Sequence, residues 1–366
     1  MMRRLKTLVL GSVLSLASLT GCEQLEYFPN SAGELAMITV ITDSTTWAGE
    51  VGDAIRTHVA PYLGTLPAPE RMFEIEQYDL LSPSLFERIK VRRNILIVAP
   101  LSDSTAVAGF LRDRLDENAL QAVAGGQTAV IGRNDLWARP QRVIYLVAQE
   151  KADLVSLIAD RADDIQYTYN EAIREWTADD MFERLQQTDK EVALLDDHAF
   201  AVNIQHDYQT VVDTTGLVYM RRVLSDTWRN LVVYYEENAN PEDLTPEWVY
   251  QTRDRITKEH MRGNVHGWVA IDYRRPLEAE NINFLGHYAF EVRGLWHMEG
   301  PDPSGRLIPL GMGGPFVSYA FYDETTRRLY LIDGMVFAPN YKKREFLRQM
   351  EAIAYSFRTP VAAEAS

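Results

Sequence analysis

Two oppositely charged residues in the last third of the chain are the first candidates for chemistry. Glu291 and Arg293 flank Val292 in a run that is typical of a β-strand. Because side chains at positions i and i+2 of a strand point to the same face, Glu291 and Arg293 either pair with each other or jointly contact a polar ligand. Trp296 and His297 follow in the same run. We take Glu291, Arg293, Trp296 and His297 as a candidate ligand or partner surface.

The histidines, serines and carboxylates show no spacing that is typical of a catalytic or metal site. No His-x-x-x-His or His-Glu-x-x-His pair, which places two imidazoles on one metal, occurs in the sequence. No serine lies in a Gly-x-Ser-x-Gly turn. Paired carboxylates such as Asp196 with Asp197, or Glu278 with Glu280, carry no sequence sign of the surroundings that acid catalysis needs. We predict no metal and no cofactor, and the catalytic residues, if the chain is an enzyme, stay unknown.

A glycine-rich segment at 311–315 raises the hypothesis of a phosphate-binding loop. Such loops lie between a strand and the N-terminus of a helix. Here the segment leads into an apolar run at 316–322 that indicates a strand, so we predict a turn or bulge. The basic residues at 327–328 and 342–344 are expected at solvated ends of elements rather than in an anion site.

The aromatic residues of the second half allow two interpretations. Trp228, Trp248, Trp268 and Trp296 could line a groove for a glycan or a peptide, because aromatic faces supply large contact areas. Such residues more commonly pack in a core, and we expect that here.

The first residues have the organisation of a bacterial secretion signal. Basic residues at 3, 4 and 6 precede an apolar run at 8–19, which is shorter than the roughly 20 residues of a membrane-spanning helix. The run ends in Leu19-Thr20-Gly21-Cys22, which resembles the lipobox of bacterial lipoproteins. The resemblance implies a signal peptide at 1–21, lipidation of Cys22 and a lipidated tether at 22–34. Glu23, which is not the Asp of inner-membrane retention, favours the outer membrane of the cell envelope. An ordinary signal peptide with an incidental cysteine is the alternative.

Charge and cysteine content exclude several classes of function. Removal of 1–21 takes away three basic residues and no acidic one, which moves the formal net charge from −15 to −18. Such an acidic chain disfavours nucleic acid, whose binding depends on basic residues that neutralise phosphates. Cys22 is the one cysteine, so its lipidation leaves no thiol for a disulfide or a nucleophile. The expected partners are the membrane, through the lipid on Cys22, and an envelope protein or glycan.

The residues from 35 to 188 predict an α/β domain. Runs of strand length alternate with segments whose apolar residues recur every three or four positions, as on one face of a helix. The expected strands lie at 35–41, 73–78, 94–99, 128–131 and 143–147, and the expected helices at 47–62, 82–90, 105–124 and 152–187.

The residues from 189 to 360 predict an α+β domain with a largely antiparallel sheet between layers of helices, an α/β/α sandwich. The fold class of the whole chain is therefore α+β, with two α/β-type domains. The expected strands lie at 200–204, 217–223, 231–235, 268–271, 283–296, 316–323 and 328–337, and the expected helices at 245–261 and 341–357.

Several runs in both halves resemble known families. The segments around Tyr208, at 329–332, 339–343 and 353–357 resemble the fold of PsbP and of the Ran-binding protein Mog1. The segments at 92–98, 291–298, 313–318 and 343–353 resemble an uncharacterised lipoprotein family of Bacteroidota that carries a domain of unknown function. This second resemblance implies no activity.

Two functions from different classes remain open. The first is a membrane-anchored binding or assembly module, which the Mog1-like resemblance favours by analogy. The alternative is an envelope hydrolase that uses carboxylates, with His287 or His297, in a cleft between the domains.

Overall fold

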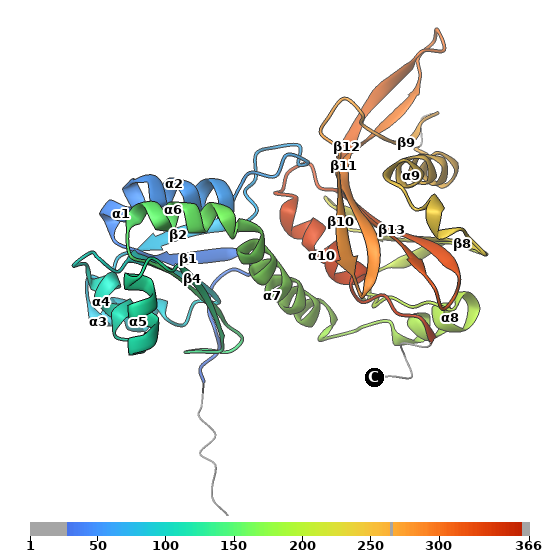
Figure 1. Ribbon diagram of the computed structural model, residues 1–366. Helices are drawn as coiled ribbons and strands as arrows, with labels where there is room; N and C mark the ends of the chain where they lie inside the picture. The colour runs from blue at the N-terminus through green and yellow to red at the C-terminus, as the bar shows by residue number, and fades with distance from the viewer. Residues whose placement is uncertain (1–27, 264–265, 361–366) are drawn as a thin grey trace, which may run out of the picture.

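The computed structural model describes residues 28–263 and 266–360, which form two lobes connected by a long helix (Figure 1). The predicted signal peptide and Cys22 lie outside these residues. Part of the predicted tether is bound to the first lobe, because the Ser31 N–H donates to the Arg139 carbonyl at 2.9 Å and the Ala32 N–H donates to the Val91 carbonyl at 2.8 Å.

A five-stranded mixed sheet forms the centre of the first domain. Its order is β2-β1-β3-β5-β4, and the edge strand β4 runs antiparallel to β5 while the other pairs are parallel. Every residue of β3 is buried, as expected for the central strand of a sheet covered on both faces. The strands are β1 (Met37–Ile41), β2 (Glu74–Tyr78), β3 (Asn94–Pro100), β4 (Ala129–Asn134) and β5 (Arg142–Ala148).

Helices cover both faces of this sheet, so the predicted α/β architecture is confirmed. One face packs against α1 (Ser44–Ala48), α2 (Glu50–Ala54), η1 (Ile55–Val59), α6 (Lys151–Asp160) and the first half of α7 (Ala162–Phe182). The other face packs against α3 (Pro83–Ile89), α4 (Ala106–Arg112) and α5 (Glu117–Ala124).

Three of the predicted helices are divided into shorter ones, in one case by a side-chain cap. Asp116 accepts a hydrogen bond from the Ala119 N–H and starts α5, which divides the expected helix at 105–124. The expected helix at 47–62 is divided among α1, α2 and η1, and the one at 152–187 breaks at Arg161 between α6 and α7.

An eight-stranded antiparallel sheet forms the second domain. Its order is β10-β11-β12-β13-β8-β7-β6, and β9 pairs with β11 beyond the end of β10. The strands are β6 (Gln209–Thr214), β7 (Leu217–Val223), β8 (Trp228–Glu237), β9 (Trp268–Ile271), β10 (Glu278–Phe284), β11 (His287–Pro301), β12 (Leu307–Asp323) and β13 (Arg328–Phe337).

Helices lie on both faces of the second sheet as well. One face packs against α10 (Arg344–Ala354), α8 (Thr188–His198) and the last turn of α7, and the other against α9 (Pro246–His260) and the turn η2 (Pro241–Asp243). The chain is therefore an α+β protein with two sheets, and its C-terminal sheet is antiparallel with helices on both faces, as predicted.

Two strand predictions in this domain are wrong. The run at 200–204 is buried but is not a strand; it makes a single bridge, from Ala201 to Arg358. The expected single strand at 283–296 is interrupted by a hairpin turn. Leu285 and Gly286, both with positive φ, turn the chain, so that residues 283–284 end β10 and residues from 287 onward form β11.

The helix α7 belongs to both cores. Its residues Ile165, Tyr169 and Ile173 are buried in the first domain, whereas Met181 is buried among residues of the second. In Figure 1, α10 lies beside α7 on the side of the second sheet that faces the first domain. Within the described residues, no helix is long and apolar enough to cross a membrane.

Candidate functional site

The predicted pair of Glu291 and Arg293 lies on β11 and faces α10. The Arg293 Nε donates to Glu291 Oε1 at 2.5 Å, and Arg293 Nη2 donates to Glu351 Oε1 on α10 at 2.8 Å. All three side chains are less than a quarter exposed. The pair predicted on one strand face is therefore a triad that connects the sheet to α10.

Arg293 and Glu351 of the triad are held in their charged states. Burial acts against the charge of Arg293, but Glu291 and Glu351 together raise the pKa of its guanidinium well above the ordinary value. Burial also opposes the charge of Glu351, but Arg293 and Arg348 hold the pKa of its carboxyl below the ordinary value. This arrangement stabilises ions rather than supplying a proton donor.

The other two predicted surface residues lie elsewhere. Trp296 is 4% exposed, lies on the opposite face of β11 and donates from its indole N–H to the Val336 carbonyl at 3.2 Å. His297 lies between Asp272 and Glu299, at 3.5 and 3.3 Å from their carboxylates. His297 lies four positions after Arg293 along β11, about 13 Å away. The four predicted residues therefore do not form one surface.

The surroundings of the neighbouring carboxylates on β10, Glu278 and Glu280, differ from those expected from the sequence. Glu278 lies opposite Arg293, and Glu280 lies opposite Glu291, so four charged residues share two adjacent strands. Burial, and then the charge of Glu280, raise the pKa of Glu278. This environment depends on the pairing of β10 with β11, which has no signal in the local sequence around Glu278.

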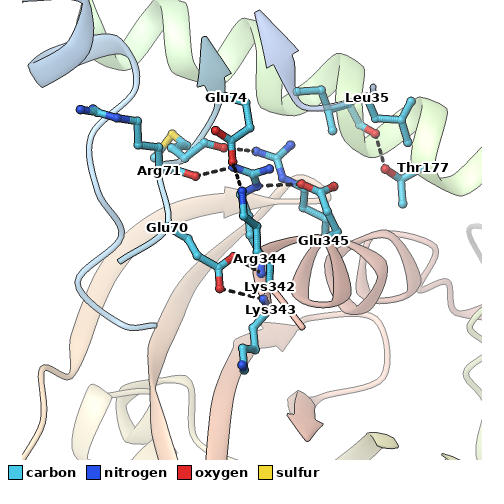
Figure 2. Close-up of polar contacts among 12 residues, drawn as sticks. Leu35, Glu70, Arg71, Glu74, Thr177, Lys342, Lys343, Arg344 and Glu345 are labelled. Carbon is cyan, nitrogen blue, oxygen red and sulfur yellow. Dashed lines mark hydrogen bonds and ion pairs between the residues drawn. The ribbon is translucent and has the colours of Figure 1, made fainter. Parts of the chain in front are cut away.

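The loop before β2 makes the closest polar contact between the domains (Figure 2). Glu70, which is 5% exposed, accepts hydrogen bonds from the backbone N–H groups of Lys343 and Arg344 at 2.8 and 3.0 Å. No side chain of α10 itself caps this end of the helix. The carboxylate from the first domain therefore caps a helix of the second, where the helix dipole favours a negative charge.

Further ion pairs complete this interdomain seam, which we define as residues 70–74 with 342–348. The Lys342 Nζ lies 2.7 Å from Glu74 Oε1 and lowers the pKa of that carboxyl, against the effect of burial. Arg344 Nη1 donates to the Arg71 carbonyl at 2.6 Å, and Arg348 Nη2 donates to the Met72 carbonyl at 2.8 Å.

The expectation that the basic residues at 342–344 are solvated is wrong for Arg344. Its side chain is 5% exposed because the loop of the first domain covers it. Neither Glu70 nor the buried state of Arg344 has a local sequence signal, since the contact joins residues 274 positions apart.

The glycine-rich segment lies within β12, in agreement with the predicted bulge and not with a phosphate loop. Between the pairs His297 with Gly313 and Glu299 with Pro309, three residues of β12 lie opposite one residue of β11, and Gly311 at their centre has φ +79°. From this bulge onward, β11 and β12 extend out of the body as an arm, residues 298–312, whose base also pairs with β9 at Met298 and Glu299 (Figure 1).

One edge of this arm has no partner strand. Along β12, the pairing with β13 begins at Phe316, and β11 occupies the opposite edge. For residues 28–263 and 266–360, the second edge at 307–313 is therefore unpaired, and Leu307 is 53% exposed.

Within the described part of the chain, no three histidine, cysteine, aspartate or glutamate residues lie close enough to bind one ion. His287, the other candidate of the hydrolase hypothesis, packs its ring against Phe321 at 5.1 Å between centroids.

Comparison with known proteins divides the chain in two. Residues 31–182 match the model of a domain of unknown function, DUF8532. Residues 186–356 match a second one, DUF4837. Both halves are thus similar to domains of unknown function, which agrees with the resemblance to a family that carries such a domain. No curated protein sequence matches the chain.

Solved structures similar to the chain include the Ran-binding protein Mog1p of Saccharomyces cerevisiae. That structure shares 9% identity, and the match covers 44% of this chain and 90% of that chain with a TM-score of 0.29. A mutant of protein Mog1 shares 10% identity at the same coverage, with a TM-score of 0.28.

Proposed function

We propose that this chain is a lipid-anchored lipoprotein of the bacterial envelope, held at the outer membrane through Cys22, that acts as a non-enzymatic binding or assembly module. Its partner is an envelope protein that adds an extended segment to the arm at 298–312. The observation that carries this proposal is the unpaired edge of β12 at 307–313.

An unpaired strand edge presents N–H and C=O groups that another chain can pair with. Natural proteins protect such edges with charged side chains, prolines or bulges, or by covering them. The edge at 307–313 carries no charged residue, but Pro309 and the bulge at Gly311 interrupt it. The backbone at the exposed Leu307 and at Ile308 is therefore the part of the edge that favours a docking strand.

The position of the arm suits a tethered protein. The dark blue segment at the start of the described chain lies at the lower end of the first domain, whereas the arm extends from the upper end of the second (Figure 1). An anchor that precedes residue 28 would leave the arm directed away from the membrane and accessible to a partner.

The interdomain seam argues against the hydrolase alternative. A hydrolase site between the domains needs an open cleft with unpaired acids. Where loop 70–74 meets α10, Glu70 and Glu74 are already bound by backbone N–H groups and by Lys342. His297 lies beside β9 and is not part of this seam.

A photo-crosslinking amino acid at position 307, introduced in cells, tests the docking strand. A reproducible adduct with one envelope protein is expected at position 307, and none at position 81, a leucine of the first domain that is even more exposed than Leu307. Leu307→Lys, which adds charge to the edge, should abolish capture from a crosslinker at position 309, and Leu81→Lys should not. Equal capture from positions 307 and 81 would contradict the proposal.

A further inference from the structure

A small hollow opens on the first domain beside β4, the edge strand of its sheet. The opposite edge strand, β2, is the one next to the interdomain seam. It has a volume of ≈ 210 Å³, close to the volume of about seven water molecules. Its lining combines β4 and β5 with the end of α4, and consists of Leu111, Arg114, Leu115, Ile131, Arg133, Leu136, Trp137 and Tyr145.

The strand register explains why these residues meet. Ile131 on β4 lies opposite Tyr145 on β5, so both side chains point to the face covered by α4 and α5. Arg133 follows Ile131 by two residues and therefore points to the same face. Arg114 comes from the turn after α4, on the other side of the hollow.

The apolar part of the lining is extensive for so small a space. Leu111 is buried, and Leu115, Ile131, Leu136 and Trp137 are half-buried members of the same core. A bare inorganic anion would leave these surfaces without contacts. The lining therefore favours a ligand with an apolar body.

Three residues that carry hydrogen-bond donors line the same hollow. Arg114 and Arg133 are exposed, and no carboxylate of the described residues lies within 4 Å of either. Arg114 donates to the Phe110 carbonyl and Arg133 to the Gly132 carbonyl, each from one nitrogen, which leaves the other N–H groups free. Two such arginines at one hollow stand out in a chain of net charge −15.

The third donor is the hydroxyl of Tyr145. The residue is 7% exposed, and its hydroxyl makes no hydrogen bond to any described residue. Burial raises the pKa of Tyr145, and the charges of Arg114 and Arg133 act in the opposite direction, so both guanidinium groups lie within electrostatic range of the hydroxyl. At neutral pH the hydroxyl stays protonated and can donate.

We propose that this hollow binds a small monocarboxylate with an aliphatic or aromatic body, with Arg114, Arg133 and the Tyr145 hydroxyl on the carboxylate and Trp137 with its apolar neighbours on the body. The site lies in the first domain and goes beyond the docking arm of the second. The carboxylate can belong to a free short-chain acid or to the C-terminus of a peptide that ends in an apolar residue.

Calorimetric titration of the purified two-domain protein with hexanoate, hexan-1-ol, inorganic phosphate and acetyl-Ala-Leu tests the site. Hexanoate should bind, and both hexan-1-ol and phosphate should bind at least ten-fold more weakly, because each lacks one half of the required chemistry. Tighter binding of acetyl-Ala-Leu than of hexanoate would assign the carboxylate to a peptide C-terminus; the reverse would assign it to a free acid. Binding of hexan-1-ol or of phosphate as tight as that of hexanoate would overturn the proposal.

Variants then locate the binding. Arg114→Gln and Arg133→Gln should each weaken hexanoate about ten-fold, the loss expected for one charge-assisted hydrogen bond. Arg275→Gln, which changes an exposed arginine of the second domain, should leave the affinity unchanged. Tyr145→Phe should weaken hexanoate but not hexan-1-ol. Circular dichroism verifies the fold of each variant, and unchanged affinity in both arginine variants would also refute the site. Leu307→Lys should bind hexanoate normally, so failure of the docking arm and failure of this site are distinguishable.

Discussion

Glu70 accepts a hydrogen bond from the backbone N–H of Arg344 at 3.0 Å, although 274 positions separate the two residues. The same carboxylate accepts from the Lys343 N–H, so it satisfies two of the N–H groups that the first turn of α10 cannot pair internally. The two domains are joined by this cap as well as by α7.

Glu70→Ala should lower the free energy of unfolding by about 2 kcal/mol, because it removes a buried cap and leaves two N–H groups without a partner. Urea unfolding followed by circular dichroism measures the loss. Glu324→Ala, at an exposed turn between β12 and β13, should change the stability by less than about 0.5 kcal/mol. If the two variants lost equal stability, the cap would have no energetic role.

Arg293→Met should be more damaging than any single change at the seam. It leaves Glu291 and Glu351 facing each other without their shared cation, and breaking a buried pair from one side costs on the order of 3 kcal/mol. The double variant Arg293→Met with Glu351→Gln should recover part of the loss. If Arg293→Met were as stable as the wild type, the result would favour the other interpretation, in which Glu291 and Arg293 jointly contact a polar ligand.

Acidic pH should lower the free energy of unfolding, because some carboxylates have a depressed pKa in the folded state. The folded pKa values of Glu74 and Glu351 lie below the ordinary value of 4.5. Their contribution to stability is therefore complete above about pH 4.5 and is lost as the pH falls through the depressed values. Unfolding in urea at pH 6.0, 4.5 and 3.5 should show this decline.

The variant Glu74→Gln gives the matched comparison for the acid effect. It should be less stable than the wild type at pH 6.0, and the difference should shrink at pH 3.5, where the wild-type carboxyl approaches its own protonated form. A difference that stayed constant from pH 6.0 to 3.5 would exclude a contribution from the charge of Glu74.

Lipidation of Cys22 remains a prediction from the lipobox alone. Cells grown with a labelled fatty acid should incorporate label into the wild-type chain, and Cys22→Ala should abolish the incorporation. In the same cells, Cys22→Ala should move the protein from the membrane fraction to the soluble fraction. Equal labelling of the two chains would exclude the anchor.

Sequence patterns predicted elements whose cause is local. Ser82, Thr105 and Thr245 each cap the helix that follows, as side-chain acceptors for backbone N–H groups three residues later. A helix was also predicted at 341–357, and Leu347, Met350 and Ile353 are buried on one side of α10. In these cases the information needed lies within a few residues.

The failures have non-local causes. The run at 200–204 is apolar enough for a strand, but it does not pair with a strand of the sheet: Ala201 bridges to Arg358, and Phe200 stacks on Phe357. β6 is exposed along nearly its whole length, so it has no alternation of buried and exposed residues. Glu291 and Arg293 were placed on one face correctly, whereas Glu351, which completes their triad, comes from α10 and could be found only from the fold.

The cap on α10 has a consequence for how the chain is made. During synthesis, the residues of the first domain emerge from the ribosome well before α10, which comes last among the described elements. Glu70 is then already in place when Lys343 and Arg344 appear. The first domain thus acts as an internal template for the second, because the Glu70 carboxylate is a fixed hydrogen-bond acceptor at which α10 can start.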